Sequence, residues 1–454
     1  MEKLFFRKIE LWCVALLLLV GLVATLFFGA IVKDEVESRT AQNRPATFGR
    51  LGDRAYRLAS IPETVGRILT ETNPLEADDY QRFGTQSGWT RYADTDLVSG
   101  YLLLARIDGD VGKAVVELVG LSDLSVRHRW NADPAILFAG ASRAYKGTDY
   151  SQWEPDRFRV MHPFLNSDGS LTLHGQQSPL VSMDACGRRT MISEDLHVHH
   201  SLNRDADGNF WAPTQIEAKD GEPPHRYEND GLAKFAADGT LAFARAIPDL
   251  LADHDLTHLV FPGYSFQRSI VHLNDIQPVL ADGPYWRKGD VFVSLRRQSM
   301  ILLYRPSTDE ILWMKQGPWV AQHDVDILDD HRIGVFDNHV TDRGAGIEIE
   351  GQSDIVVYDF ATDTVSRPFT AALGRAGLAA KSNGLFDMTE SGHLIVEEDT
   401  SGRILLIGPD QTLLADFINR GAGQKVFRMG WSRYISQADG DAALAAIAAQ
   451  GPCD

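Results

Sequence analysis

Residues 301–313 read ILLYRPSTDEILW, an apolar run, a polar turn and a second apolar run. Such a pattern predicts two antiparallel strands joined by a short connection. Related segments recur along the chain, at residues 115–126, 180–192, 232–243, 301–313, 355–365 and 404–413. Their starts lie 49 to 69 residues apart, with a mean of about 58.

This repeat decides the predicted fold. One hairpin cannot bury both of its faces alone, and radial repetition of six such units leaves no long open sheet edge. We therefore predict an all-β fold, a six-bladed β-propeller over residues 90–440. The alternatives fit less well, since a β-helix has a much shorter period and a β-sandwich would not give six similar hairpins.

The segment before the propeller is apolar. Residues 11–32 read LWCVALLLLVGLVATLFFGAIV and carry no charge. As a helix they would be about 33 Å long, enough to cross a bilayer core of about 30 Å. Because Lys3, Arg7 and Lys8 precede them, residues 1–10 are expected in the cytoplasm. We expect a single-pass transmembrane signal anchor in the inner (cytoplasmic) membrane, with the propeller facing the periplasm. A cleaved signal peptide is the alternative.

Composition bounds the remaining possibilities. Residues 33–89 read as a polar, partly helical stem and residues 441–454 as a C-terminal tail. The 62 acidic residues outnumber the 44 basic ones, and a net charge of −18 argues against a nucleic-acid partner.

Cys13, Cys186 and Cys453 lack any metal-binding spacing. At most Cys186 and Cys453 can form an intramolecular bridge, and both this pairing and the oligomeric state stay open.

A second repeated element precedes most hairpins: a histidine, a turn and an apolar strand. It occurs at His162, at the pair His199–His200, at His272 and at His323, and Asn383 replaces the histidine in the next unit. Equivalent positions of successive blades form a ring about a propeller axis. We therefore expect histidines 162, 200, 272 and 323 at one mouth of the central channel. Arg296 is expected to join them from the strand after His272, with Arg297 on the opposite face.

These residue types suit an anion. A guanidinium offers a rigid pair of donors to oxygen atoms, and a neutral imidazole is a nucleophile near neutral pH. A structural histidine at each blade start is the alternative for any one of them. A metal site completed by Asp324 and Asp326 is the alternative for the set. Five further histidines fit no ring position and are predicted on the surface or in loops, namely His197, His254, His258, His331 and His339.

At this point the sequence resembles a known family. The segments around His272, Arg296, His323 and Asn338, and the pair His199–His200 with its following Asp-Gly turn, look like those of the bacterial arylsulfate sulfotransferases. The resemblance covers about residues 90–440. It implies a six-bladed propeller with its active site in the central channel. It also implies sulfuryl transfer from an aryl sulfate to a phenol, with no cofactor, metal or nucleotide donor.

The resemblance also implies roles. His323 matches a transiently sulfated histidine, while His272 and Arg296 match residues that hold the sulfate oxygens. His200 matches the remaining site histidine. Substrate-binding positions are expected at His199, His162, Asn274 and Asn338. The family's separate N-terminal β-domain and acceptor-binding loop have no counterpart here, because an anchor and stem precede residue 90 and the interval between Arg296 and His323 is short.

The sequence leaves three functional hypotheses. The first is a membrane-anchored aryl-sulfate sulfotransferase. The second is a non-catalytic extracytoplasmic propeller that binds an anionic or aromatic ligand, for which Trp286, Trp313 and Trp319 would offer aromatic faces. Packing within the blades is the alternative for these three tryptophans. The third is a metal-dependent hydrolase or lyase.

Overall fold

The chain divides into two compact units, an N-terminal unit and a β-domain. The first comprises residues 1–72 with 263–266, and the second comprises residues 73–262 with 267–454. The computed structural model describes residues 10–40, 47–61, 73–77, 80–93, 97–145, 148–217, 227–261, 268–344 and 346–453.

The N-terminal unit contains two helices, α2 (Leu11–Thr40) and α3 (Gly49–Ala59). Asp34 fixes the start of the second helix, because its carboxylate accepts from the backbone N–H and the hydroxyl of Thr47. The segment Leu11–Val36 is long and apolar enough to cross a membrane. By length and composition it fits either a membrane anchor or a signal sequence.

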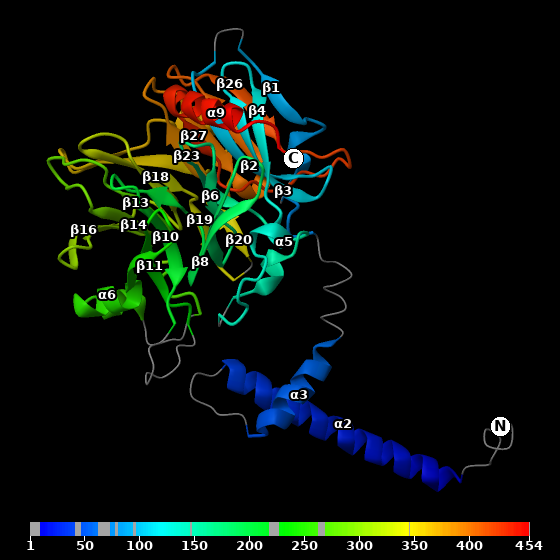
Figure 1. Cartoon of the computed structure of the whole chain (residues 1–454). Coiled ribbons are helices and arrows are strands. Elements are labelled where there is room, and N and C mark those ends of the chain that lie inside the picture. Colours follow the sequence, from blue (N-terminus) through cyan, green and yellow to red (C-terminus); the bar gives the residue numbers. More distant parts are fainter. Residues whose placement is uncertain are drawn as a thin grey trace. The chain divides into compact units, whose positions relative to one another are not determined.

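The β-domain is an all-β, propeller-like arrangement of antiparallel sheets that follow one another in chain order (Figure 1). Four sheets have four or five strands each. The first has the order β27 (Arg433–Ile435), β2 (Tyr101–Asp108), β3 (Lys113–Gly120) and β4 (Ser125–Asn131). The others contain β13 (Leu273–Pro278), β14 (Val291–Leu295), β15 (Met300–Arg305) and β16 (Glu310–Gln316); β17 (His323–Ile327), β18 (Arg332–Asp337), β21 (Asp354–Asp359) and β22 (Thr364–Ser366); and β23 (Leu385–Met388), β24 (Leu394–Glu398), β25 (Arg403–Ile407), β26 (Leu413–Ile418) and β1 (Gly88–Arg91).

A larger sheet has eight strands: β5 (Met161–Leu165), β6 (Leu171–His174), β7 (Ser178–Met183), β8 (Arg189–Val198), β9 (Asn203–Arg204), β10 (Phe210–Gln215), β11 (Asp230–Phe235) and β12 (Leu241–Ala246). A small hairpin, β19 (Val340–Asp342) with β20 (Ile347–Ile349), projects from the sheet of β17. Each of the six repeated segments coincides with an antiparallel pair of strands, β3–β4, β7–β8, β11–β12, β15–β16, β21–β22 and β25–β26.

Short helices connect the strands. They are α5 (Pro134–Leu137), α6 (Ile247–Asp253), α7 (Thr257–Val260) and α8 (Thr370–Ala376), with the 3₁₀ turns η1 (Tyr80–Phe83), η2 (Tyr150–Trp153) and η4 (Asp399–Ser401). A longer helix, α9 (Gln437–Gln450), follows the last strand. It extends into residues 441–454, the predicted C-terminal tail.

The hydrophobic core lies between neighbouring sheets. Inner strands such as β2 are buried on both faces, whereas the outermost strand β16 alternates between exposed and half-buried residues. This difference explains why inner strands read as continuous apolar runs and outer ones as alternating patterns. One core cluster joins Leu102 and Leu104 of β2 to Ile404 and Leu406 of β25, so the last sheet packs against the first.

Three of the turns between strands follow an Asp-x-x-Gly pattern, at residues 184–187, 205–208 and 399–402. In the β9–β10 turn the Asp205 carboxylate accepts from the backbone N–H groups of Asp207 and Asn209. Gly208 then adopts a φ of +88°, a conformation that costs glycine little. This chemistry fixes where the chain reverses in the β9–β10 turn and therefore where β10 begins.

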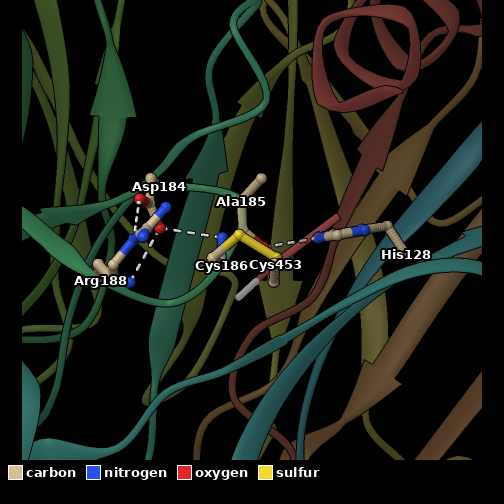
Figure 2. The surroundings of a disulfide bond; sticks show 6 residues. All are labelled: His128, Asp184, Ala185, Cys186, Arg188 and Cys453. Carbon is tan, nitrogen blue, oxygen red and sulfur yellow. Dashed lines mark hydrogen bonds and ion pairs between the residues drawn. A yellow bond between two sulfur atoms is a disulfide. The ribbon is translucent and has the colours of Figure 1, made fainter. Parts of the chain in front are cut away.

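The C-terminal end of the chain completes the first sheet. Strand β27 pairs with β2, so the red and orange C-terminal elements lie beside the cyan N-terminal strands in Figure 1. After α9 the tail reaches the β7–β8 turn, where Cys453 and Cys186 form a disulfide across 267 residues of sequence. Figure 2 shows this bond between His128, which contacts the Ala185 carbonyl, and the Asp184 turn. The two cysteines therefore do meet.

We expect this bond to stabilise the β-domain strongly. Closing so long a loop removes much of the conformational entropy of the unfolded chain, and native disulfides are worth about 2–4 kcal/mol. The Cys453→Ser variant should therefore unfold at lower urea concentration, followed by tryptophan fluorescence. Cys13→Ser is the matched control, because Cys13 is a free thiol in α2. Equal unfolding midpoints for Cys453→Ser and the control would contradict this expectation.

Candidate functional site

The predicted site histidines lie where the inner strands begin. His162 is the second residue of β5, His200 precedes β9, His272 directly precedes β13 and His323 opens β17. A left-handed backbone occurs at His162 (φ +40°), His200 (+60°) and His272 (+52°). Non-glycine residues hold this conformation at a cost and only where their surroundings impose it, often at functional sites. With a left-handed backbone, these three rings do not follow the alternation of side chains between the two faces of an ordinary strand.

Three of these histidines form a cluster. One ring nitrogen from each of His200, His272 and His323 lies within 4.8 Å of the others. Their ring centres are 5.5, 6.2 and 6.4 Å apart. His323 is fully buried, His200 is nearly so, and His272 is half-buried at the wall of a cavity of about 630 Å³.

Arg296 brings a positive charge to the cluster. It lies in the turn after β14, where its backbone N–H donates to the His272 carbonyl at 3.1 Å, and its side chain lines the same cavity. The prediction that it lies on the strand was wrong, because β14 ends at Leu295 and the chain already turns. Arg297 was expected on the opposite face, yet it lines the cavity as well. A turn does not preserve the alternation of a strand.

The cluster histidines are neutral near pH 7. Burial is the main cause that lowers their pKa values, and the guanidinium of Arg296 lowers those of His272 and His323 further. The pKa of His272 falls to about 4. A neutral imidazole keeps a lone pair on one nitrogen, so each ring is an acceptor or nucleophile as well as a donor.

The hydrogen bonds of Asn338 decide which nitrogen of His323 carries the proton. Its side-chain amide donates to the carbonyls of Ala380 and Asn383, at 3.0 and 2.6 Å. Its Oδ1 therefore faces Nδ1 of His323 at 2.6 Å and can only accept. Nδ1 must carry the hydrogen, which leaves the lone pair on Nε2. That Nε2 is buried and has no hydrogen-bond partner among the described residues.

The other predicted substrate-binding residues surround the cluster without joining it. His162 accepts from the Leu202 backbone N–H at 3.3 Å. His199 lies behind His200, with the two Nδ1 atoms 2.7 Å apart. Asn274 donates to the carbonyl of Gln322, the residue before His323, at 2.7 Å. These contacts fix the positions of His200 and His323.

Trp431 completes the surroundings of the cluster and was not predicted from the sequence. Its indole lies 5.8 to 6.2 Å from the rings of His162, His200 and His323. It precedes β27, and its φ of +60° matches those of the histidines that precede other inner strands. The signal was its place just before the closing strand, in a segment that no hairpin pattern marked.

The structure also places the tryptophans and the other histidines that were considered in the sequence. Trp286 and Trp319 are buried in the core between two sheets, and Trp313 packs against Tyr358 and Phe360, so their role is blade packing. His197 was predicted on the surface but is buried, stacked on Tyr145. It lies near the end of β8 and is covered by residues that precede that strand, with Tyr150 and Trp153 beside its ring and Thr148 hydrogen-bonded to its Nδ1 at 2.7 Å. His258 lines the cavity of Arg296.

Below the histidines, acidic residues connect the inner strands. The carboxylates of Asp275, Asp324 and Asp387 accept the backbone N–H groups of Val325, Phe386 and Tyr434, each on the next inner strand. Asp324 and Asp326 were the predicted completion of a metal site. Neither belongs to the His200–His272–His323 cluster. Among the described residues of this region, that cluster is the group whose ligand atoms lie close enough together to hold a metal ion. The positive charge of Arg296 beside that cluster favours an anion over a metal cation.

The acidic set predicts a stabilising substitution. Burial raises the pKa of Asp326 well above its usual value, and the neighbouring Asp387 and Asp275 carboxylates raise it further. Because the folded state then holds the proton more tightly, stability is largest below about pH 4 and falls as pH rises toward the raised pKa. Asp326→Asn should remove this loss and gain about 1.4 kcal/mol near pH 7 for each pKa unit relieved.

Thermal unfolding of wild type and Asp326→Asn between pH 4 and 8 measures this effect. The difference in melting temperature should grow with pH. The exposed Asp123, which pairs with Arg127, supplies the matched control Asp123→Asn. A variant that melts below wild type at pH 8 would contradict the expectation.

A family model described as Arylsulfotransferase (ASST) matches residues 172–420, more than half of the chain. The chain belongs to the arylsulfotransferase family. The matched region contains His200, His272, Arg296, His323 and Asn338. No curated protein matches the sequence.

Solved structures resemble this arylsulfotransferase-family chain only distantly. A Bacteroides caccae protein of unknown function is 10% identical with a TM-score of 0.46, and covers 74% of this chain and 99% of its own. The virginiamycin B lyase from Staphylococcus aureus is 12% identical with a TM-score of 0.35, covering 60% and 78%. The WD40 β-propeller domain of Doa1 is 10% identical with a TM-score of 0.36, covering 78% and 98%.

Proposed function

We propose that this protein transfers a sulfuryl group from an aryl sulfate to a phenol through a sulfated His323. The observation that supports this most is the state of His323. Its Nδ1 is held as a donor by Asn338, its Nε2 lone pair has no partner among the described residues, and the Arg296 cation lies close enough to lower its pKa. A neutral nucleophile beside a fixed positive charge is what attack on an anionic ester requires.

In the first half-reaction the Nε2 lone pair of His323 attacks sulfur, and the bond from sulfur to the aryl oxygen breaks. The phenolate leaves with that electron pair. The sulfated ring becomes cationic, and Asn338 Oδ1 stabilises it by accepting from Nδ1–H. Arg296 neutralises charge on the sulfuryl oxygens, and His272 and His200 lie beside them as neutral hydrogen-bond donors.

In the second half-reaction a phenol occupies the place of the departed phenolate and takes the sulfuryl group from His323. A remaining histidine, which gave a proton to the leaving phenolate in the first half-reaction, accepts the proton of the incoming phenol, so the enzyme returns to its starting state. Both half-reactions use the chain's own side chains.

We further propose that the β-domain has six blades. The eight-stranded sheet then counts as two, because β8 and β10 share a single register pair, Val198 with Thr214. Its two halves also pack face to face, with Leu180 and Val198 against Ala212 and Ala233. A single continuous sheet does not pack against itself in this way. The histidines then lie on the axis that six blades share.

The N-terminal helix is proposed as an uncleaved anchor in the inner membrane, with the β-domain in the periplasm. The cationic flank of the helix and the Cys186–Cys453 disulfide support this, because disulfides persist in oxidising compartments. Protease added to spheroplasts should digest the β-domain and leave the helix in the membrane. A protected domain, or a mature chain that begins after residue 30, would contradict the proposal.

Mass spectrometry of the full chain tests the reaction. The detergent-purified protein is exposed briefly to 4-nitrophenyl sulfate without a phenol acceptor, and then digested. We expect a sulfuryl adduct on the peptide that contains His323, lost when a phenol is added. Saturable binding without an adduct would support a binding propeller instead, and turnover abolished by a chelator would support a metal-dependent enzyme.

A further inference from the structure

We propose that Asp230 and His199 form a proton relay through which His200 protonates the departing phenolate and later deprotonates the incoming phenol. This inference rests on the proposed sulfuryl transfer and assigns its acid–base chemistry. His200 is the residue that exchanges the proton with substrate. His199 and Asp230 act through it and are positioning residues.

The first contact of the relay joins two imidazoles. Nδ1 of His199 lies 2.7 Å from Nδ1 of His200, and the rings meet edge to face at 4.9 Å. Consecutive strand residues normally point to opposite faces, and the left-handed backbone at His200 brings the two rings together instead. One of the two nitrogens must carry a hydrogen for this contact to form, and the other must accept it.

The second contact joins His199 to a buried carboxyl group. Nε2 of His199 is buried and without a hydrogen-bond partner among the described residues, and Oδ1 of Asp230 lies 3.7 Å from it. The other oxygen, Oδ2, accepts the Leu273 backbone N–H at 3.0 Å, which holds Asp230 against the start of β13. Hydrogen bonds of catalytic groups are often longer before substrate binds. A closure of less than 1 Å brings this pair to bonding distance.

Two proton arrangements satisfy this chain. In the first, Asp230 is protonated toward His199 Nε2, His199 donates from Nδ1 to His200, and His200 carries its hydrogen on Nε2 as an acid. In the second, Asp230 is ionised, His199 carries its hydrogen on Nε2, and His200 donates from Nδ1 and keeps a free Nε2 lone pair as a base. Burial raises the pKa of Asp230 to about 8, so the first arrangement is accessible near neutral pH.

The two arrangements balance the two half-reactions. When the sulfur–oxygen bond breaks, the phenolate takes the Nε2 proton of His200. The His199 proton then moves to His200 and the Asp230 proton moves to His199. The negative charge of the phenolate is thereby transferred to Asp230 while the sulfated His323 ring is cationic, so the total charge of the site does not change. The incoming phenol reverses every shift as it takes the sulfuryl group.

The test uses the sensitivity of the reaction to its leaving group. A relay matters little for 4-nitrophenyl sulfate, whose phenolate is stable, and greatly for 4-methoxyphenyl sulfate, whose phenolate is strongly basic. The rate of adduct formation on the full chain is measured for both esters. In Asp230→Asn the amide donates permanently to His199 Nε2, which prevents the second arrangement.

We expect Asp230→Asn to react with the nitrophenyl ester within about threefold of wild type and with the methoxyphenyl ester about 10²-fold or more slowly. His199→Gln should behave alike, since its amide can hold His200 but cannot pass a proton. The matched control is Asp275→Asn. Asp275 is also buried and also accepts the backbone N–H of the next inner strand, yet its bonds run to Val325 and Asn203 rather than to a histidine.

Each outcome distinguishes the two proposals. An adduct on wild type, together with an equal fall for both esters in the two folded variants, or no fall at all, would overturn the relay alone. Absence of any adduct on wild type would overturn the sulfuryl transfer and the relay with it. Circular dichroism confirms folding, and either variant alone is sufficient to decide.

Discussion

Replacement of His323 with asparagine is expected to reduce sulfuryl transfer by about 10⁴-fold or more while leaving the fold intact. Losing a covalent nucleophile removes the two-step route entirely, and such losses reach about 10⁶-fold in other enzymes. Asparagine is close to imidazole in size and polarity, so the fully buried position beside Asn338 stays filled. Turnover of an aryl sulfate with a phenol acceptor is the measurement.

His254→Asn is the matched control for this substitution. His254 directly follows α6, and its Nδ1 is hydrogen-bonded to the Leu250 carbonyl within that helix. It lies outside the histidine cluster. It should keep wild-type turnover. If folded His323→Asn kept near-normal transfer, the nucleophile would have to be His272 or His200.

Replacement of Arg296 with lysine is expected to lower turnover by about 10²–10³-fold, the usual effect of losing one donor from an anion-stabilising site. Lysine keeps the positive charge but loses the planar pair of donors that matches two sulfuryl oxygens. The buried Nε of Arg296 has no partner among the described residues, so this donor is available to a ligand. Turnover with a fixed aryl sulfate measures the loss.

Arg245→Lys supplies the control for charge-conserving replacement. Arg245 pairs with Asp253 and Asp309 on the outer surface, away from the cavity that Arg296 lines. Near-normal turnover is expected for it. A similar fall in both variants would mean that the loss at Arg296 reflects stability rather than anion binding.

The hairpins could be predicted because they depend on local information. Apolar runs separated by a short polar turn mark each strand pair, and both signals lie within about 13 residues, as in residues 301–313. Ring closure could not be predicted in the same way. Strand β27 is three residues long and pairs with β2, more than 300 positions earlier, so no nearby partner pattern marks it.

The site was predictable to the extent that it repeats. Histidines at equivalent blade positions converge, and three of the four form one cluster. Trp431 escaped prediction because it lies just before the closing strand β27, in a segment that no hairpin pattern marks. Asp230 escaped because it is an ordinary acidic residue at the start of β11, and its role depends on what the fold brings to it. Arg296 lies beside the cluster, as expected, but in a turn rather than on a strand, since a strand end shifted by one residue changes where a side chain points.

The Cys186–Cys453 bond has a consequence for how the protein is made. The sheet that starts the β-domain lacks its innermost strand until residues 433–435 have been synthesised, and Cys453 follows even later. Residues 433–435 must therefore be present before β2 gains this neighbour, and the bond can form correctly only after Cys453 has been synthesised. A free thiol at Cys186 then marks an immature molecule. Oxidation of Cys186 to this disulfide would therefore show that the chain has been synthesised as far as Cys453.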